Sequence, residues 1–185
     1  YWGSNYTWNA MDFIGETFPN GKMMIDSVHK QNAHIMISIW ASFGPQTQQY
    51  AKLKEKGLLF DFETWPQSGL SHIWPPRMDY PSGVKVYDAF SPVARQIYWD
   101  HLKKLFDYGM DAWWMDSTDP DFFNAKKEHY EQKGAMGSWR SVRNLFPLAT
   151  VKGIYEKQRK ASEVKRVFIM TRSAFAGQQL YGSGL

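Results

Sequence analysis

The sequence predicts an α/β fold in which a parallel sheet is flanked by helices. Short runs of alternating apolar and polar residues are typical of strands. Along the chain they alternate with longer runs whose apolar residues recur at helical spacing. Strands that alternate with helices favour a parallel sheet. The chain has 185 residues, of which 43% are hydrophobic and 22% charged. It is therefore long enough to bury a sizeable core, as one domain or part of one, and too hydrophobic to be disordered.

The first helix and the first strand lie near the beginning of the chain. A helix is predicted over residues 22–31, where Asn32 can end it. The strand that follows, over residues 34–40, has an aliphatic face and a mixed face. The mixed face carries His34, Met36, Ser38 and Trp40. We expect His34 to be a packed core histidine and the other histidines to be solvated or structural.

The middle of the chain combines a long irregular stretch with a clear helix. Residues 41–83 have no long periodic segment and are rich in Gly, Pro and aromatic residues, so we expect a long loop, which is usually functional. A short strand is predicted over residues 84–89. The helix that follows covers residues 92–108, because Ser91 is a good N-cap and Gly109 can end it.

The last part of the chain repeats the strand–loop–helix order. A strand is predicted over residues 110–116, a polar loop over 117–139, a helix over 148–161 and a strand over 165–174. Three such units with long loops after the strands fit about half of a (β/α)8 TIM barrel, since a whole barrel needs about 250 residues. A doubly wound open sheet is the rival, but no Gly-rich phosphate loop follows any strand.

Composition narrows the classes of function. Aromatic residues make up 17% of the chain and include nine Trp, which indicates either a Trp-rich core or a cleft for flat ligands such as sugars. No apolar run is long enough for a transmembrane helix. The net charge of +4 is spread among acids, which argues against nucleic acid as a partner. The absence of Cys excludes disulfides and thiolate metal sites.

Both ends predict a segment of a longer protein, with residues 1–185 forming part of one domain. The chain opens without Met, a basic region or an apolar region, and it stops directly after a strand-like run. We expect any targeting signal to lie outside the segment. An isolated part-barrel exposes unpaired strand edges, so we expect the fragment to associate and to be inactive.

Candidate catalytic residues lie at the ends of the predicted strands. In a barrel, chemistry sits at the carboxyl ends of the strands and on the loops that follow. Strand alternation predicts that Trp40, Asp116 and Arg172 point into one mouth, where they would form an acid, a cation and an aromatic wall.

Further acids follow Asp116 in the run DSTDPD, namely Asp119 and Asp121. Neighbouring carboxylates suit glycoside hydrolysis, which uses two of them. A capped turn or a hard-cation site would also explain the run. It lacks the central Gly and the closing Glu of a calcium loop, so we expect no metal there.

Two long runs resemble family 31 glycoside hydrolases. The run GMDAWWMDSTDPD, residues 109–121, resembles the nucleophile motif of these retaining α-glucosidases and α-xylosidases, and looks most like the α-xylosidase branch. The run FIMTRSAFAGQQ, residues 168–179, is similar to a later strand of their barrel, and residues 1–45 also look familial. The resemblance implies a catalytic barrel domain.

The resemblance also implies roles for single residues. Asp116 matches the catalytic nucleophile and Arg172 the substrate-binding arginine. Trp40 matches an aromatic residue that lines the sugar site, and Trp114 holds the inward position two before the nucleophile. Asp119 supports the site, and Tyr80 matches a pocket aromatic. The general acid/base Asp is expected beyond residue 185, and no metal or organic cofactor is needed.

The implied function is the release of terminal α-xylosyl residues from an oligosaccharide, with α-glucosyl residues as the alternative. A different class, a carbohydrate-binding module without catalysis, would also explain the aromatic excess. Its usual scaffold is a strand-only sandwich, which the helix at residues 92–108 argues against. The resemblance suggests a protein of the periplasm or the extracellular space.

Overall fold

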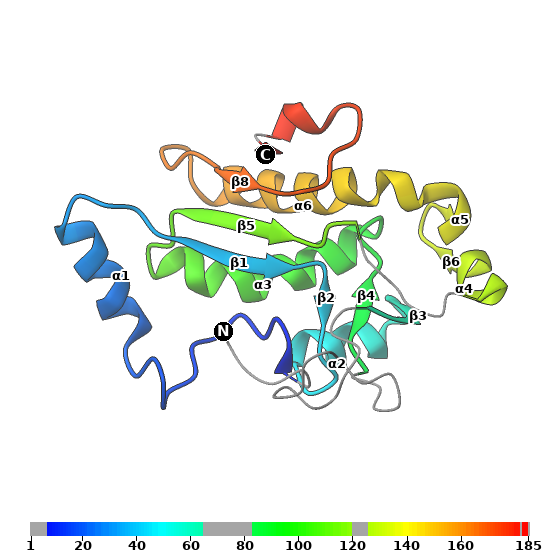
Figure 1. Ribbon diagram of the computed structural model, residues 1–185, viewed down its shortest axis with the longest axis horizontal. Helices are drawn as coiled ribbons and strands as arrows, with labels where there is room; N and C mark the ends of the chain where they lie inside the picture. The colour runs from blue at the N-terminus through cyan, green and yellow to red at the C-terminus, as the bar shows by residue number, and fades with distance from the viewer. Residues whose placement is uncertain (1–6, 65–82, 120–125, 182, 185) are drawn as a thin grey trace.

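A parallel sheet organises the computed structural model of the protein (Figure 1). The structure describes residues 7–64, 83–119, 126–181 and 183–184. The sheet has the order β1-β5-β8-β9, and each neighbouring pair is parallel. Its strands are β1 (Met36–Trp40), β5 (Ala112–Asp116), β8 (Ile169–Met170) and β9 (Ser183–Gly184). Within the described residues the sheet stays open, so the chain forms part of a TIM barrel.

Two long helices cover one face of this sheet, α3 (Pro92–Asp107) and α6 (Phe146–Ala161). Trp113 points from β5 into the helix layer, where it is fully buried and its Nε1 donates to Gln158 Oε1 at 2.7 Å. The side chains on either side of Trp113 in β5 face the other way, because side chains alternate along a strand. Trp114 and Asp116 therefore share the concave face, which the helices do not cover.

The predicted end signals at Asn32, Ser91 and Gly109 lie at the boundaries of α1 (Gly21–Lys30) and α3. In α1, the Asn20 side chain accepts from the Met23 N–H, and Asn32 beyond the helix adopts a φ of 56°. At α3, Ser91 accepts from Ala94, and Gly109 follows the helix at a φ of 108°, which glycine adopts without strain. Along the described stretches, the helices are all too short or too polar to cross a bilayer.

The strand predicted at residues 84–89 does not belong to the parallel sheet. It is β4 (Lys85–Tyr87), the central strand of an antiparallel sheet with β2 (Ser42–Phe43) and β3 (Leu59–Glu63). The strand itself is confirmed, but its expected place in the parallel sheet was wrong, because alternation identifies a strand and says nothing about its partner. Two chain reversals after β1 bring these strands together, and Val86 and Tyr87 then bury their side chains in the core.

The two predicted long loops also contain regular structure. Residues 41–83 hold β2, β3 and α2 (Gln48–Glu55), and residues 117–139 hold α4 (Lys127–Glu131) and the hairpin of β6 (Lys133–Gly134) and β7 (Gly137–Ser138). α2 was missed because it buries only Gln49 and Leu53, too few to set a pattern. The remaining short elements are α5 (Trp139–Val142) and the 3-10 helices η2 (Arg143–Leu145) and η3 (Gln178–Tyr181).

Much of the aromatic excess is core. Phe60, Phe62 and Phe146 surround Trp139, with ring centroids 4.9, 5.2 and 5.3 Å from that of the indole. This cluster joins the antiparallel sheet to α5 and α6. Four tryptophans of the described residues are buried, namely Trp40, Trp99, Trp113 and Trp139. Of the two interpretations of the composition, the Trp-rich core thus accounts for most of the described tryptophans.

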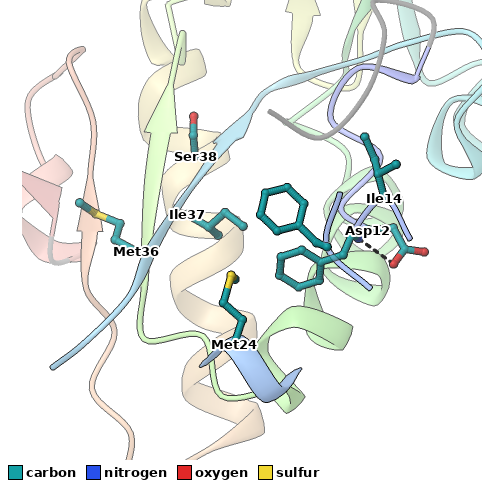
Figure 2. A pocket seen from close by; sticks show the side chains of 8 residues that line it. Asp12, Ile14, Met24, Met36, Ile37 and Ser38 are labelled. Atoms are coloured by element: carbon teal, nitrogen blue, oxygen red, sulfur yellow. Dashed lines mark hydrogen bonds between the residues drawn. The ribbon is translucent and has the colours of Figure 1, made fainter. Parts of the chain in front are cut away.

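β1 forms one edge of the parallel sheet in the described part of the chain. Beside it lies an apolar hollow of about 230 Å³, shown in Figure 2. Phe13, Phe18 and Met24 line the hollow together with Ile37 of β1. This open edge is where an incomplete barrel ends.

Candidate active site

The candidate site lies at the carboxyl edge of the parallel sheet. The register pairs Trp40 with Asp116 and Trp114 with Met170, so the paired side chains lie on the same face. Arg172 follows β8 by two residues and reaches the end of β5. Strand β8 covers only Ile169–Met170 of the strand predicted over residues 165–174, and the segment after Met170 makes side-chain hydrogen bonds through Thr171 and Arg172.

Arg172 lies between two carboxylates. Its Nε is 3.2 Å from Asp119 Oδ1 and 3.6 Å from Asp116 Oδ1. Its Nη2 donates to Ser117 Oγ at 3.2 Å. A guanidinium offers several donors in a fixed plane, so one side chain orients both acids and the hydroxyl. In a calcium loop a bound ion lies between the carboxylates. Here the guanidinium of Arg172 provides the positive charge.

Among the described residues, the contacts of the Asp116 carboxylate are made through one oxygen only. Oδ1 accepts from the Ser117 N–H at 2.7 Å, and Ser117 has a φ of 50°. A non-glycine residue in this left-handed region costs about 1–3 kcal/mol, and such strain gathers at functional sites. In residues 7–64, 83–119 and 126–181, no hydrogen bond reaches Oδ2. The carboxylate is thus oriented, with one oxygen open to a ligand.

A set of hydroxyls supports this arrangement from beneath. Thr118 Oγ1 bonds to Thr171 Oγ1 at 2.6 Å, and both residues are buried. Ser173 Oγ donates to Asp119 Oδ1 at 3.0 Å and also bonds to Thr118. These supporting residues were not predicted from the sequence. A hydroxyl pair directly after Asp116, facing Thr and Ser around Arg172, was the available signal.

Trp40 lies deeper than the acids. Its ring meets Trp8 edge-on at 4.8 Å, and its carbonyl accepts from Asn9 Nδ2 and Tyr98 Oη, both at 2.6 Å. Its buried Nε1 has no hydrogen-bond partner among the described residues. A buried N–H of this kind is rare and calls for a partner. Trp114 is half-buried on the concave face, beside Ser38 in the register.

One predicted site residue, Tyr80, lies outside the described residues. The expectation for His34 was wrong, because its side chain is 86% exposed at the amino end of β1. There it lies 3.6 Å from Asp111, which precedes β5. Burial acts to raise the pKa of Asp111, but hydrogen bonds from the Ile35 N–H and His29, with the charge of Lys165, hold that pKa below its ordinary value.

Comparison with known proteins identifies the family. The profile of the glycosyl hydrolases family 31 TIM-barrel domain matches residues 1–184. The chain belongs to glycosyl hydrolase family 31. It is 32% identical over 189 residues to an α-xylosidase of Saccharolobus solfataricus, covering 99% of this chain and 22% of that protein. It is 29% identical over 197 residues to the neutral α-glucosidase C of Homo sapiens, covering 96% of this chain and 19% of that protein.

Solved structures agree with this assignment. The crystal structure of a family 31 α-xylosidase from Xanthomonas citri superposes with a TM-score of 0.83 at 31% identity, covering 99% of this chain and 20% of that one. The chain thus spans about a fifth of the length of the relatives it matches. The predicted family and the predicted barrel are both confirmed.

Proposed function

We propose that this chain carries the nucleophile of a retaining α-glycosidase, and that the nucleophile is Asp116. One observation carries the proposal: Asp116 lies at the carboxyl end of β5 with Oδ1 fixed by the Ser117 N–H and by Arg172, and with Oδ2 open. Barrel enzymes hold their chemistry at this end of the strands. Membership of a glycosyl hydrolase family supports the same role.

The reaction would proceed in two displacements. Asp116 attacks the anomeric carbon, the bond from that carbon to the leaving oxygen breaks, and a glycosyl ester forms. A second carboxylic acid protonates the leaving oxygen, then takes a proton from the water that cleaves the ester. We expect this acid/base outside the 185-residue chain, which alone would then show no turnover. No step requires a metal ion or an organic cofactor.

The proposed substrate is an oligosaccharide with a terminal α-xylosyl residue. Likeness to α-xylosidases of two organisms supports this choice. Arg172 and Asp119 would bond sugar hydroxyls, with Trp40, Trp114 and Tyr80 as aromatic walls. An α-glucosyl substrate is the second candidate, supported by the likeness to a neutral α-glucosidase.

The test uses the full-length protein that contains this chain. Rates on an aryl α-xyloside and an aryl α-glucoside are compared with those of Asp116→Ala, and a fluorosugar inactivator labels the nucleophile for peptide mass spectrometry. We expect xyloside preference, a loss on the order of 10⁴-fold in the variant, and the label on Asp116. Glucoside preference lost in the variant would keep the mechanism and select the second candidate.

The matched control is Asp107→Ala, which removes an exposed carboxylate from the outer helix α3 and should retain the rate of the unmodified protein. Activity that survives Asp116→Ala, or a label on another residue, contradicts the proposal. Sugar binding without turnover by the unmodified protein would identify a binding module instead.

A further inference from the structure

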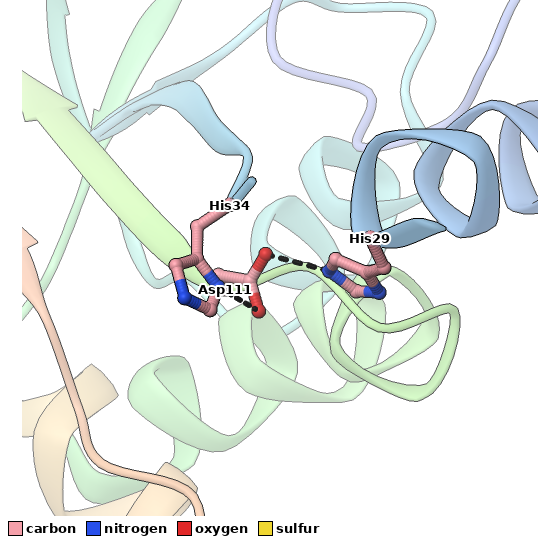
Figure 3. Close-up of side chains that lie close together, drawn as sticks. All are labelled: His29, His34 and Asp111. Atoms are coloured by element: carbon pink, nitrogen blue, oxygen red, sulfur yellow. Dashed lines mark hydrogen bonds and ion pairs between the residues drawn. The ribbon is translucent and has the colours of Figure 1, made fainter. Parts of the chain in front are cut away.

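Three side chains that commonly ligate metals meet at the opposite end of the sheet, the amino ends of β1 and β5 (Figure 3). His29 comes from the last turn of α1, His34 from the segment before β1, and Asp111 from the residue before β5. One ligand atom of each lies within 4.8 Å of the others. Residues far apart in the sequence therefore form one cluster.

The carboxylate sits between the two imidazoles. Asp111 Oδ2 is 2.8 Å from His29 Nε2, and Oδ1 is 3.6 Å from His34 Nδ1. Two imidazole nitrogens and one carboxylate oxygen match the donor set of zinc sites that keep a fourth position open. At Zn–ligand distances of about 2.1 Å, tetrahedral donors lie about 3.4 Å apart, so a contraction of roughly 1.4 Å would close the cluster.

Two of the three ligands are already positioned. Asp111 Oδ2 accepts from the Ile35 N–H at 2.9 Å, which fixes the carboxylate. The His29 ring packs against Gly109, where a Cβ would come within 3.3 Å of its Cε1. Only His34 has to move, and its 86% exposed side chain turns at little cost. Ligands held in this way by their neighbours favour metal binding.

We propose that His29 Nε2, His34 Nδ1 and the Asp111 carboxylate bind one divalent metal ion of the zinc class, with water completing the coordination. Because Nε2 now donates to the carboxylate, its proton moves to Nδ1 of the same ring when the metal takes its place. Nothing in this step requires an oxidant or a further reactant.

Lys165 sets the limit on affinity. Its Nζ is 3.5 Å from Asp111 Oδ1, so it repels a cation there. The same ammonium donates to the carbonyls of Gly109 and Met110, at 2.9 and 2.6 Å, which hold it beside the cluster. We therefore expect binding in the micromolar range, and tighter binding when this charge is removed.

The bound ion would have a structural role. It would join the end of α1 to the beginnings of β1 and β5, where Asp111 already bonds to His29 and to the backbone of Ile35. The five residues of β5 separate this cluster from Asp116 by roughly 16 Å. The site therefore stabilises the fold without reaching the proposed chemistry, and a ligand that binds only the native state raises the melting temperature.

The experiment titrates the full-length protein, stripped with a chelator, with ZnCl2 by calorimetry, and follows the melting temperature. CoCl2 replaces it for visible absorption, which reports nitrogen ligation. We expect one equivalent at this site, a rise in melting temperature, and affinity weakened about tenfold or more in His34→Ala and His29→Ala. The exposed position of His34 keeps its variant folded.

Two variants complete the design. His101→Ala, which removes a histidine from α3, should leave zinc affinity within twofold, and Lys165→Met should tighten it severalfold because a competing charge is lost. The proposal is overturned if the protein shows no saturable zinc binding. It is equally overturned if His34→Ala and His29→Ala both bind as the unmodified protein does.

Discussion

Strand β5 has an aspartate at each end, and the two aspartates differ in their hydrogen-bond partners. Asp111 at its amino end is 17% exposed and receives the Ile35 N–H, His29 and the charge of Lys165. Asp116 at its carboxyl end has one oxygen fixed and one open, beside a residue with a φ of 50°. Each aspartate faces a cation from the region of β8, but both oxygens of Asp111 have partners, whereas no hydrogen bond from a described residue reaches Oδ2 of Asp116. The carboxylate at the amino end therefore ties segments of the fold together, and the one at the carboxyl end keeps an oxygen open for the proposed chemistry.

The largest expected effect on stability comes from removing the buried side chain that lies between the two aspartates. Trp113 lies in β5 between the two aspartates, fully buried and bonded to Gln158. Trp113→Ala should lower the free energy of unfolding by about 3–5 kcal/mol, because it leaves a cavity and an unpaired amide. Urea denaturation of the full-length protein measures it. Trp114→Ala on the open face is the control, and an equal loss there would contradict the assignment of faces.

The next largest effect is a difference in stability between variants of the two aspartates. Asp111→Asn should cost about 1–3 kcal/mol, since three donors lose their charged acceptor. Asp116→Asn should cost under about 1 kcal/mol, because functional sites give up stability for their chemistry. Thermal unfolding of both variants, side by side, tests the difference. If Asp116→Asn is the more destabilising of the two, the comparison fails.

The hydroxyls beneath the candidate site should give a smaller effect. Thr118→Val keeps the shape of a buried side chain but leaves Thr171 and Ser173 without their shared partner. We expect a loss of about 1–2 kcal/mol. Denaturation compared with Ser141→Ala, an exposed hydroxyl on α5, provides the measurement. Equal effects would mean that the buried hydroxyls add nothing specific.

The smallest expected effect is on the pH dependence of stability. It comes from a histidine that lies at neither end of β5. Burial and the charge of Lys52 hold the pKa of His101 below its ordinary value of 6.5, against the opposing effect of Asp100. The unfolded chain thus binds the proton more readily, so this contribution to stability is complete above pH 6.5 and is lost as the pH falls through the folded pKa. His101→Gln should flatten the melting temperature between about pH 7.5 and about pH 5.5. An unchanged slope would exclude His101 as its source.

The residues at the carboxyl end of the sheet could be predicted because they follow the regular geometry of parallel strands. Alternation gives the faces, and the ends of parallel strands meet, so Trp40, Asp116 and Arg172 converge without knowledge of any contact. The supporting hydroxyls of Thr118 and Thr171 follow no period, and only the fold brings them together.

The amino end could not be predicted. His29 and Asp111 are 82 residues apart and carry no local signature, so their meeting depends on where α1 ends against β5. The antiparallel sheet was misassigned for a related reason. A three-residue strand such as β4 has a pattern, but the pattern does not select between a parallel and an antiparallel neighbour.

The interval between β1 and β5 has a consequence for synthesis. Ile35 and its partner Asp111 are 76 residues apart, so at about 5–20 residues per second the first strand waits roughly 4–15 s for its neighbour. The antiparallel sheet between them is complete in that interval, since all its strands precede β5. The nascent chain therefore closes a local layer first, while the apolar edge of β1 stays exposed to chaperones until β5 emerges from the ribosome.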